Sequence, residues 1–169
     1  MDSLVFDTSA ILNFGHRGEL TVLLKKLSGE YKVFTTPAAQ NELTDPNRKD
    51  FYAAFLKEYF TVQSATTSFD IATLVRLART MDPAEITVMA LASELKGRAV
   101  IDERAACREA RALGIKVTGT IGLLNEGLKK LWLTEADCLS AVAKLCATGF
   151  YIPRLAPGQS FADYLSAIE

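Results

Sequence analysis

Two aspartates directly follow short apolar runs that read as buried strands, and these are the residues most suited to chemistry. Asp7 ends the first run and Asp102 ends a later one, with Glu42 and Glu85 near predicted helix starts between them. Acids at strand ends lie where open α/β sheets bind their ligands. If the strands are neighbours in one sheet, the acids converge and repel one another unless a cation neutralises them. The pattern predicts a divalent-metal site.

Each acid also has a plainer interpretation. Asp7 can serve as the N-cap of the helix that follows. Glu85 stands three residues after an aspartate, with proline between, so a capping box also accounts for it. Glu42 has polar neighbours, and a solvent-facing glutamate is the common outcome there. Glu103 directly follows Asp102 and is expected to point elsewhere, so Asp102 is favoured as the direct ligand and Glu103 as a supporting residue.

Composition limits how the chain could hold nucleic acid. Its 19 Lys and Arg nearly balance 20 Asp and Glu, so no overall field attracts an anion. A nucleic-acid substrate would need a local basic patch or metal-bridged phosphate. Arg104 and Arg108 are four residues apart just beyond Asp102, where they could contact phosphates, although such groups are more often solvated helix faces. The single histidine, His16, excludes a multi-histidine zinc site.

The cysteines and the apolar stretches bear on cellular location. The three cysteines, Cys107, Cys138 and Cys146, show no Cys-x-x-Cys spacing and are best taken as small buried apolar residues. With no signal peptide in the sequence, they predict reduced thiols in a cytoplasmic protein. Charges interrupt every strongly apolar stretch before the roughly 18 residues that a membrane span needs, so no membrane association is expected.

The apolar pattern alternates between short strands and helices. Strands are expected at residues 3–6, 32–35, 60–62, 98–101 and 115–118. Short links between strand, helix and strand imply right-handed crossovers. We therefore predict an α/β fold, a three-layer α/β/α sandwich around a central, mainly parallel twisted sheet. It is expected to form one domain over 1–169, with a core at about 3–155 and a C-terminal tail at 156–169.

Several helices have recognisable starts and stops. Pro37 opens a helix that carries Glu42 in its second turn and ends at residues 45–47. Ser68 is expected to cap another helix. The residues predicted to form the buried face of that helix are Ile71, Leu74, Val75 and Ala78. Further helices are predicted at 102–113, 119–130, 134–147 and 161–168, with Gly15 and Gly18 breaking the first helix of the chain.

The segments around the acids resemble the PIN domain family. Within it they are similar to a branch of PIN-like proteins related to the toxin ribonucleases of toxin–antitoxin pairs. The likeness runs from about residue 3 to the mid 150s and rests on the segments Val5-Phe6-Asp7-Thr8-Ser9-Ala10, Thr36-Pro37-Ala38-Ala39-Gln40-Asn41-Glu42-Leu43, Pro83-Ala84-Glu85-Ile86-Thr87-Val88-Met89-Ala90-Leu91-Ala92, Val100-Ile101-Asp102-Glu103-Arg104 and Leu113-Gly114-Ile115-Lys116-Val117-Thr118-Gly119-Thr120.

This resemblance implies roles for individual residues. Asp7, Glu42, Glu85 and Asp102 would form a catalytic, metal-binding acidic quartet, with Glu103 as the reserve. The hydroxyls that would orient a carboxylate, a metal-bound water or a phosphate belong to Thr8, Ser9 and Thr120. The implied activity is that of a Mg²⁺- or Mn²⁺-dependent endoribonuclease, the toxin of a toxin–antitoxin pair. Its expected partners are RNA, a protein antitoxin that covers the acidic pocket, and a second copy in a homodimer.

The sequence also departs from that branch. Asp82-Pro83-Ala84 stands where a glycine-rich approach is usual, and Asp102-Glu103 replaces a pair of aspartates. These departures and the near-neutral charge motivate an alternative, a non-catalytic PIN-like module that binds nucleic acid or protein. A third class, a small-molecule phosphohydrolase of another open α/β fold, would place a second aspartate two residues after Asp7, where this chain has Ser9.

Overall fold

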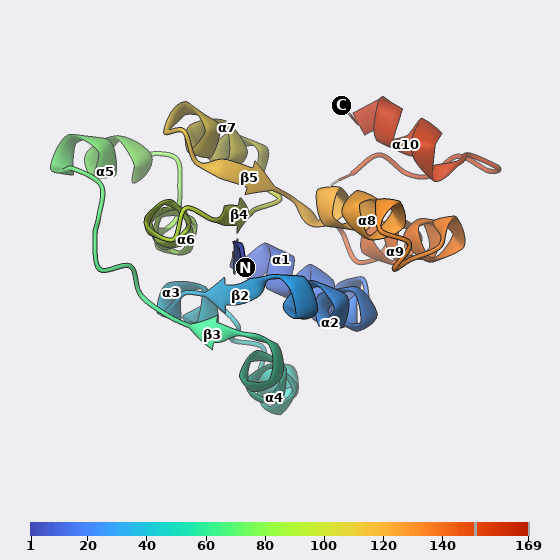
Figure 1. Ribbon diagram of the computed structural model, residues 1–169, viewed down its shortest axis with the longest axis horizontal. Coiled ribbons are helices and arrows are strands. Elements are labelled where there is room, and N and C mark those ends of the chain that lie inside the picture. Colours follow the sequence, from blue (N-terminus) through green and yellow to red (C-terminus); the bar gives the residue numbers. More distant parts are fainter. Residues whose placement is uncertain (151, 169) are drawn as a thin grey trace.

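The computed structural model describes residues 1–150 and 152–168, and a five-stranded sheet lies at its centre (Figure 1). The strands are β1 (Ser3–Phe6), β2 (Lys32–Thr35), β3 (Thr61–Val62), β4 (Arg98–Val100) and β5 (Lys116–Thr118). They are ordered β3-β2-β1-β4-β5, and every neighbouring pair is parallel. The predicted strands are confirmed to within one residue at either end.

Helices cover both faces of this sheet, which confirms the three-layer α/β/α architecture. The helices of the first half are α1 (Thr8–Leu12), the π-helix η1 (Asn13–Arg17), α2 (Thr21–Glu30), α3 (Pro37–Asn41), the 3-10 helix η2 (Pro46–Arg48), α4 (Lys49–Tyr59) and α5 (Ile71–Leu77). Those of the second half are α6 (Pro83–Glu94), α7 (Arg104–Ala112), α8 (Thr120–Lys129), α9 (Glu135–Ala147) and α10 (Phe161–Ile168).

Successive side chains of β1 point to opposite faces of the sheet, and each face has its own apolar core. Leu4 and Phe6 are fully buried in one core with residues of α1, α2, α4, α8 and α9, while Val5 is fully buried in the other with residues of α6 and α7. Successive strand residues point to opposite faces, so a strand buried on both sides must be apolar throughout. This explains why the run before Asp7 contains no polar residue.

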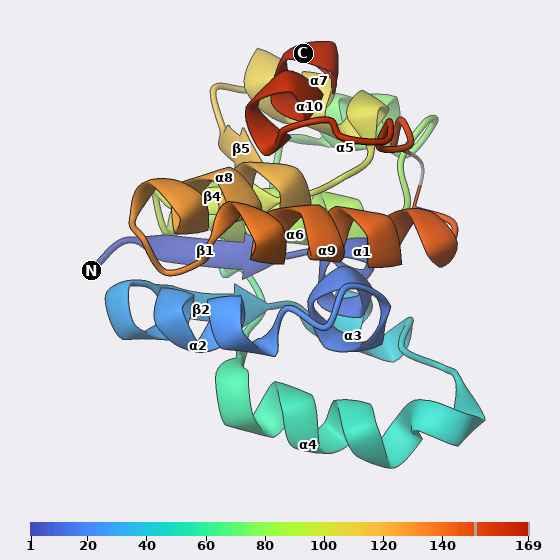
Figure 2. The ribbon, with the colours of Figure 1, turned by 90° about the vertical axis from the view of Figure 1, so that its right-hand side faces the viewer.

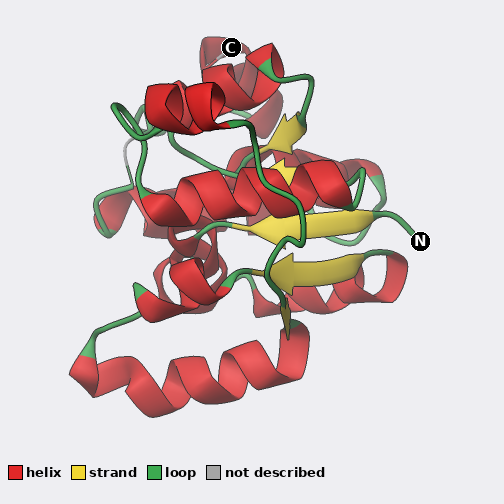
Figure 3. Cartoon of the chain, turned by 90° about the vertical axis from the view of Figure 1, so that its left-hand side faces the viewer, coloured by secondary structure: helices red, strands yellow, loops and turns green. Residues whose placement is uncertain are grey.

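The strand order places a switch point between β1 and β4. From β1 the chain adds β2 and β3 on one side, then returns to add β4 and β5 on the other. Every neighbouring pair is parallel, as the arrows of β1 and β2 show in Figure 3, so one edge of the sheet carries every carboxyl end. The crevice at such a switch point is where open α/β sheets bind ligands. Asp7 follows β1 and Asp102 follows β4 at this point.

The helix that carries Glu42 is shorter than predicted. α3 ends at Asn41, and Glu42 is its C-cap residue rather than a member of a second turn. The last turn tightens, since the amides of Glu42 and Leu43 bond carbonyls three residues back at 3.3 and 3.1 Å. Asp45 is then extended before Pro46, as the residue preceding a proline tends to be. The tightened turn, and not the proline, sets the end of this helix.

The prediction for α5 was also wrong in its cap and its buried face. Asp70, not Ser68, caps the helix, its carboxylate accepting the Thr73 amide at 2.9 Å. Ile71 and Val75 are 81% and 55% exposed, and Leu77 is the fully buried residue. The apolar spacing was real, but the helix lies at the periphery (Figure 1) and turns those two side chains outward.

The first helix of the chain is not broken at its first glycine. α1 continues into η1, which ends at Gly18, whose amide bonds the Asn13 carbonyl at 2.9 Å. A Cβ on Gly15 would lie 3.0 Å from the Tyr52 hydroxyl, so the glycine lets α4 approach. π-helical turns are rare and are frequent at functional sites. This one carries Asn13, which faces the acids.

The helices of the second half follow their predicted bounds closely. α9 begins with the expected capping box, in which Thr134 and Asp137 satisfy each other's backbone amides. α8 and α9 lie alongside the central strands (Figure 2). Among the described residues, no helix is long and apolar enough to cross a membrane.

Gly97 provides a test of how closely β4 approaches β1. A Cβ at this position would lie 2.5 Å from the Ser3 carbonyl oxygen, whereas one on Gly29 would meet nothing within 4 Å. We expect Gly97→Ala to lower the free energy of unfolding by about 1–3 kcal/mol through overpacking. Gly29→Ala, in helix α2, should raise it by about 0.5–1 kcal/mol. Urea unfolding measures both, and equal effects would contradict the close contact.

Candidate active site

Of the four acids, Asp7 is the one whose geometry agrees least with a purely structural role, which for this residue is that of a helix N-cap. It occupies the N-cap position of α1, yet its carboxylate accepts no capping hydrogen bond. Its Oδ2 instead accepts the Ser9 hydroxyl at 2.9 Å, and the residue is only 5% exposed. Burial raises the pKa of Asp7 to about 6, and the nearby charge of Asp82 adds to this rise. The carboxylate is thus desolvated without serving the helix.

Glu42 is tied to the residue after Asp7. Thr8 Oγ1 donates to Glu42 Oε2 at 2.6 Å and lies 3.3 Å from the Ala39 carbonyl oxygen. Thr8 is buried, whereas Glu42 is exposed as a residue. The bond directs the Glu42 carboxylate toward the start of α1, so this glutamate does not simply extend into solvent.

Asp102 has the most hydrogen-bond donors of the four acids. Its Oδ1 accepts the Thr120 amide at 2.7 Å, and its Oδ2 accepts the Thr120 hydroxyl at 2.6 Å and Asn13 Nδ2 at 2.9 Å. Burial raises its pKa, while these bonds from Thr120 and Asn13 lower it and so oppose the rise. A Cβ on Gly119 would lie 2.7 Å from Oδ1, so only glycine leaves room for the carboxylate there.

Glu85 forms the capping box that the sequence suggested and is also part of the acidic cluster. Its Oε2 accepts the Asp82 amide at 3.1 Å, and Asp82 Oδ1 accepts the Glu85 amide at 2.9 Å. The pKa of Glu85 is raised to about 7, first by burial and in addition by repulsion from Asp82, Asp7 and Glu103. Glu85 therefore lies near enough to two acids from other segments, Asp7 and Glu103, for their charges to affect it.

Glu103 is engaged in capping. Its Oε2 accepts the Ala106 amide at 2.7 Å, so α7 begins at Arg104 and not at Asp102 as predicted. This leaves the strand-end Asp102 outside the helix, because the capping carboxylate is supplied by the next residue along the chain. The arrangement supports the preference for Asp102 as the direct ligand of any bound cation and for Glu103 as a supporting residue.

Asn13 is a site residue that sequence reasoning missed. It is fully buried, and its Nδ2 lies 2.9 Å from Asp102 Oδ2 and 3.3 Å from Thr120 Oγ1. Its Oδ1 is buried with no hydrogen-bond partner, although buried polar atoms are nearly always paired. The available signal was an asparagine among the apolar residues Ala10 to Phe14, where no solvent-facing role explains it.

The remaining predicted residues divide between the site and elsewhere. Arg104 and Arg108 line a groove that also contains Asp102 and Glu103. His16, to which the sequence assigned no role, is hydrogen-bonded to the Tyr52 hydroxyl at 2.5 Å. Cys138 is buried as expected, whereas Cys107 and Cys146 are partly exposed.

The donors around the switch point are oxygen atoms, the ligand type that a hard divalent cation prefers. In residues 1–150 and 152–168, no three acidic, histidine or cysteine side chains are grouped as metal ligands. Mg²⁺ commonly binds one or two carboxylates and keeps several waters. Asp7 and Asp102 supply carboxylate oxygen, and Asn13 supplies an unpaired amide oxygen. A cation would also relieve the repulsion that raises the pKa of Glu85.

Comparison with known families agrees with this geometry. The family model described as the PIN domain matches residues 3–157, so the chain belongs to the PIN domain family. PIN domains are generally nucleases that bind nucleic acid and typically use divalent metal ions. No curated protein matches the chain. The membership agrees with the proximity of Asp7, Glu85 and Glu103, which come from three separate segments.

The raised pKa of Asp7 predicts a pH-dependent difference between the protein and Asp7→Asn in metal-free buffer. The folded carboxyl, with a pKa near 6, binds a proton more tightly than the unfolded one near 3.8, so ionisation costs stability as pH rises between these values. The variant should become relatively more stable over that range, by on the order of 2–3 kcal/mol above pH 6. Urea unfolding with EDTA at several pH values measures this, and a difference that shrinks with rising pH would contradict it.

Replacing Asn13 tests its contact with Asp102. Asn13→Ala should cost about 1–3 kcal/mol, because a donor to a buried carboxylate is lost. Asn13→Asp should cost about 3 kcal/mol or more at pH 7.5, since it sets one buried carboxylate against another. Asn47→Asp, at an exposed position, should change the free energy of unfolding little. Equal losses in Asn13→Asp and Asn47→Asp, measured by urea unfolding, would refute the contact.

Proposed function

We propose that this protein is a metal-dependent endoribonuclease that hydrolyses RNA phosphodiester bonds at the acids around Asp7. The observation that carries the proposal is the burial of carboxylates at the switch point: Asp7 and Glu85 are 5% and 8% exposed, and burial, with added repulsion from neighbouring acids, raises the pKa of Glu85 to about 7. In the described part of the chain, none of the ion pairs includes Asp7, Glu85 or Asp102. Membership of a generally nucleolytic family supports this assignment.

The acids would divide the work of holding a cation. Asp7 and Asp102 are the proposed direct ligands, because each follows a strand and neither caps a helix. Glu42 and Glu85 are proposed to orient bound water and complete the negative site. Bound Mg²⁺ or Mn²⁺ would acidify a water for attack on phosphorus and neutralise the developing oxyanion.

Hydroxyl groups would keep the carboxylates in place during the reaction. Ser9, Thr8 and Thr120 each donate to one acid, namely Asp7, Glu42 and Asp102. Because the donors are buried or partly buried, each carboxylate is limited to few orientations. Preorganised dipoles of this kind lower the cost of reorganisation at the moment of reaction.

Substrate phosphate would be held outside the acids by arginine. Arg104 and Arg108 are exposed at the start of α7, beside Asp102 in the same groove. Their guanidinium groups suit phosphate oxygens, which fix the register of a nucleic acid without reading its sequence. The carboxylates could then act on the phosphate that lies next to the arginine-bound segment.

The resemblance to toxin ribonucleases extends the proposal to cellular role. We propose that the protein acts in the cytoplasm as the toxin of a toxin–antitoxin pair, silenced by an antitoxin segment over the acidic pocket. A homodimer is also proposed on that resemblance. The matched segments around Asp7, Glu85 and Asp102 are the support for this branch.

A second candidate function is a PIN-like module that binds nucleic acid or protein without cutting. The observation in its favour is that Glu85 and Glu103 already accept backbone amides as helix caps. Calorimetric titration with Mn²⁺ distinguishes the two. Metal binding that is lost in Glu42→Gln supports the enzyme, and RNA binding that is indifferent to metal supports the module.

Cleavage of labelled RNA with Mg²⁺ or Mn²⁺ tests the enzyme directly. We expect Asp7→Asn and Asp102→Asn to lower the rate by about a hundredfold or more, since removing a single stabilising group in an active site typically costs that much. Glu58→Gln, an exposed acid on α4, is the matched control and should keep the parent rate. Equal cleavage by the parent protein and Asp7→Asn would rule the proposal out.

A further inference from the structure

A chain of hydrogen bonds joins α3 to α6. The Ala39 amide of α3 donates to Thr36 Oγ1 at 3.3 Å, and Thr36 Oγ1 lies 2.9 Å from Thr87 Oγ1 of α6. Thr87 Oγ1 in turn lies 2.9 Å from the Ala84 carbonyl oxygen, in the first turn of α6. Two threonine hydroxyls therefore connect the starts of the two helices.

The direction of this chain follows from what each group can donate. A hydroxyl has one proton, and a carbonyl oxygen can only accept. Thr87 therefore donates to the Ala84 carbonyl, which leaves Thr36 to donate to Thr87. Because Thr36 also accepts the Ala39 amide, each hydroxyl donates once and accepts once. Thr36 is fully buried, and hydrogen bonds linked in this way strengthen one another away from water.

Both ends of the chain reach backbone groups next to the acids. The Ala84 carbonyl belongs to the same peptide unit as the Glu85 amide. At the other end, the residue that donates to Thr36 is Ala39, and its carbonyl accepts the Glu42 amide at 3.3 Å. The chain thus fixes the backbone of Glu42 relative to that of Glu85.

The side chains of these two acids are held by different neighbours. Glu42 accepts the Thr8 hydroxyl, and Glu85 accepts the Asp82 amide. α3 has five residues, and a helix this short is not stable alone, so its orientation depends on what it contacts. Its apolar packing on α6 is non-directional. The hydrogen bonds of the hydroxyl chain are directional and supply the restraint that packing lacks.

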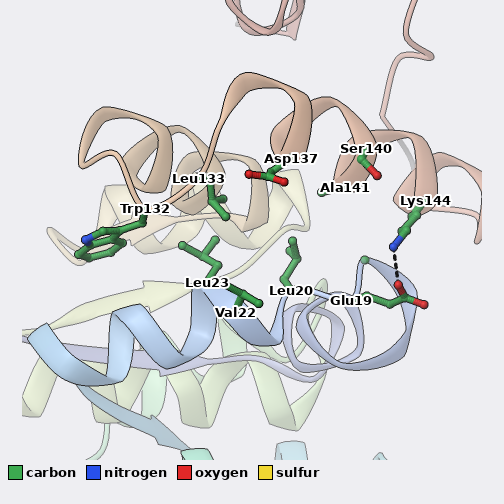
Figure 4. A pocket seen from close by; sticks show the side chains of 11 residues that line it. Glu19, Leu20, Val22, Leu23, Trp132, Leu133, Asp137, Ser140, Ala141 and Lys144 are labelled. Atoms are coloured by element: carbon green, nitrogen blue, oxygen red, sulfur yellow. Dashed lines mark hydrogen bonds and ion pairs between the residues drawn. The ribbon is translucent and has the colours of Figure 1, made fainter.

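A second link between elements, elsewhere in the molecule, is of a different kind. Lys144 of α9 pairs with Glu19, which precedes α2, beside a hollow lined by Leu20, Leu23 and Trp132 (Figure 4). The two charged side chains are 46% and 65% exposed, and exposed ion pairs contribute little to stability. This pair therefore serves as a comparison for the effect of breaking a contact between elements.

We propose that Thr87 is a positioning residue that acts through Thr36 to set the spacing of Glu42 and Glu85, the acids proposed to orient water on a bound cation. The inference rests on the proposed metal-dependent function. Removing a group that supports a metal site from outside the ligands typically weakens metal binding by about 10- to 100-fold. We expect the lower end of that range, because Thr87 acts through a second hydroxyl and the backbone.

Calorimetric titration with Mn²⁺ tests the role of the hydroxyl. Thr87→Val keeps the branched shape without the hydroxyl and should weaken Mn²⁺ binding about tenfold. Thr87→Ala removes the hydroxyl without adding a methyl group in its place and should have the same effect. Thr87→Ser keeps the hydroxyl and should bind Mn²⁺ like the parent protein. Recovery with serine would assign the effect to the hydrogen bond and not to the shape of the side chain.

Amide hydrogen exchange in EDTA measures the same restraint without metal. In Thr87→Val the amides of Ala39 and Glu42 should exchange faster, because α3 is no longer joined to α6 and opens more often. Amides of α9 should keep the parent rate, since a general loss of stability would raise the rate there as well. Thr87→Ser should exchange like the parent protein throughout.

Two control variants leave the hydroxyl chain intact. Thr148→Val removes a hydroxyl that donates to the Leu145 carbonyl at 3.0 Å, three residues earlier, as Thr87 does within α6. Lys144→Gln breaks the exposed pair with Glu19. Both variants should bind Mn²⁺ like the parent protein, and α3 should exchange at the parent rate in both.

The outcomes separate this inference from the proposed activity. The inference is overturned if Thr87→Val binds Mn²⁺ as tightly as the parent, if Thr87→Ser does not recover the affinity, or if either control loses as much as Thr87→Val. A parent protein that binds no Mn²⁺ would contradict both the inference and the metal-dependent function. A parent that binds Mn²⁺, loses affinity in Thr87→Val and cleaves no RNA would support the positioning role and contradict the ribonuclease.

Discussion

Repulsion between desolvated carboxylates is the constraint on which the site depends. Asp7 and Glu85 are buried at the carboxyl edge of the sheet, and burial, with added repulsion from Asp82 and Asp7, raises the pKa of Glu85 to about 7. Burial costs each carboxylate part of its hydration, and no arginine or lysine within the described ion pairs offsets that cost. The stability that the two apolar cores give to the fold offsets the free-energy cost of this arrangement. Buried carboxylates with raised pKa values are common where proteins bind ions or perform catalysis.

The hydrogen bonds around the acids limit how they can respond to that repulsion. Thr8, Ser9 and Thr120 each hold one carboxylate, and Asn13 reaches Asp102 from the π-helix. These hydrogen bonds therefore hold the carboxylates in place, although the repulsion between their charges favours moving them apart. Arginines of α7 and apolar residues of α10 line a groove that also contains Asp102 and Glu103.

Much of the fold follows from local pattern. The central strand β1 was foreseen because the residues of a strand buried on both faces must be apolar, and the helix starts at Pro83 and Thr134 carry capping residues that act within one turn. The failures fall on short elements. α5 has one fully buried residue, Leu77, so its apolar spacing could not reveal which face would turn inward. Glu42 lies just beyond the helix that was predicted to contain it, because α3 ends in a tightened turn and not at a helix-breaking residue.

The sequence by itself determined which residues carry charge, where strands end in acids and which short-range caps form, because these depend on neighbours a few residues away. Only the tertiary structure decided the partners of those acids. Thr8 meets Glu42 across 34 residues and Asn13 meets Asp102 across 89, and α10 comes to face the arginines of α7. Such pairings depend on the order of strands in the sheet and on how helices pack over it. Those are properties of the whole chain's buried surface, which no local spacing records.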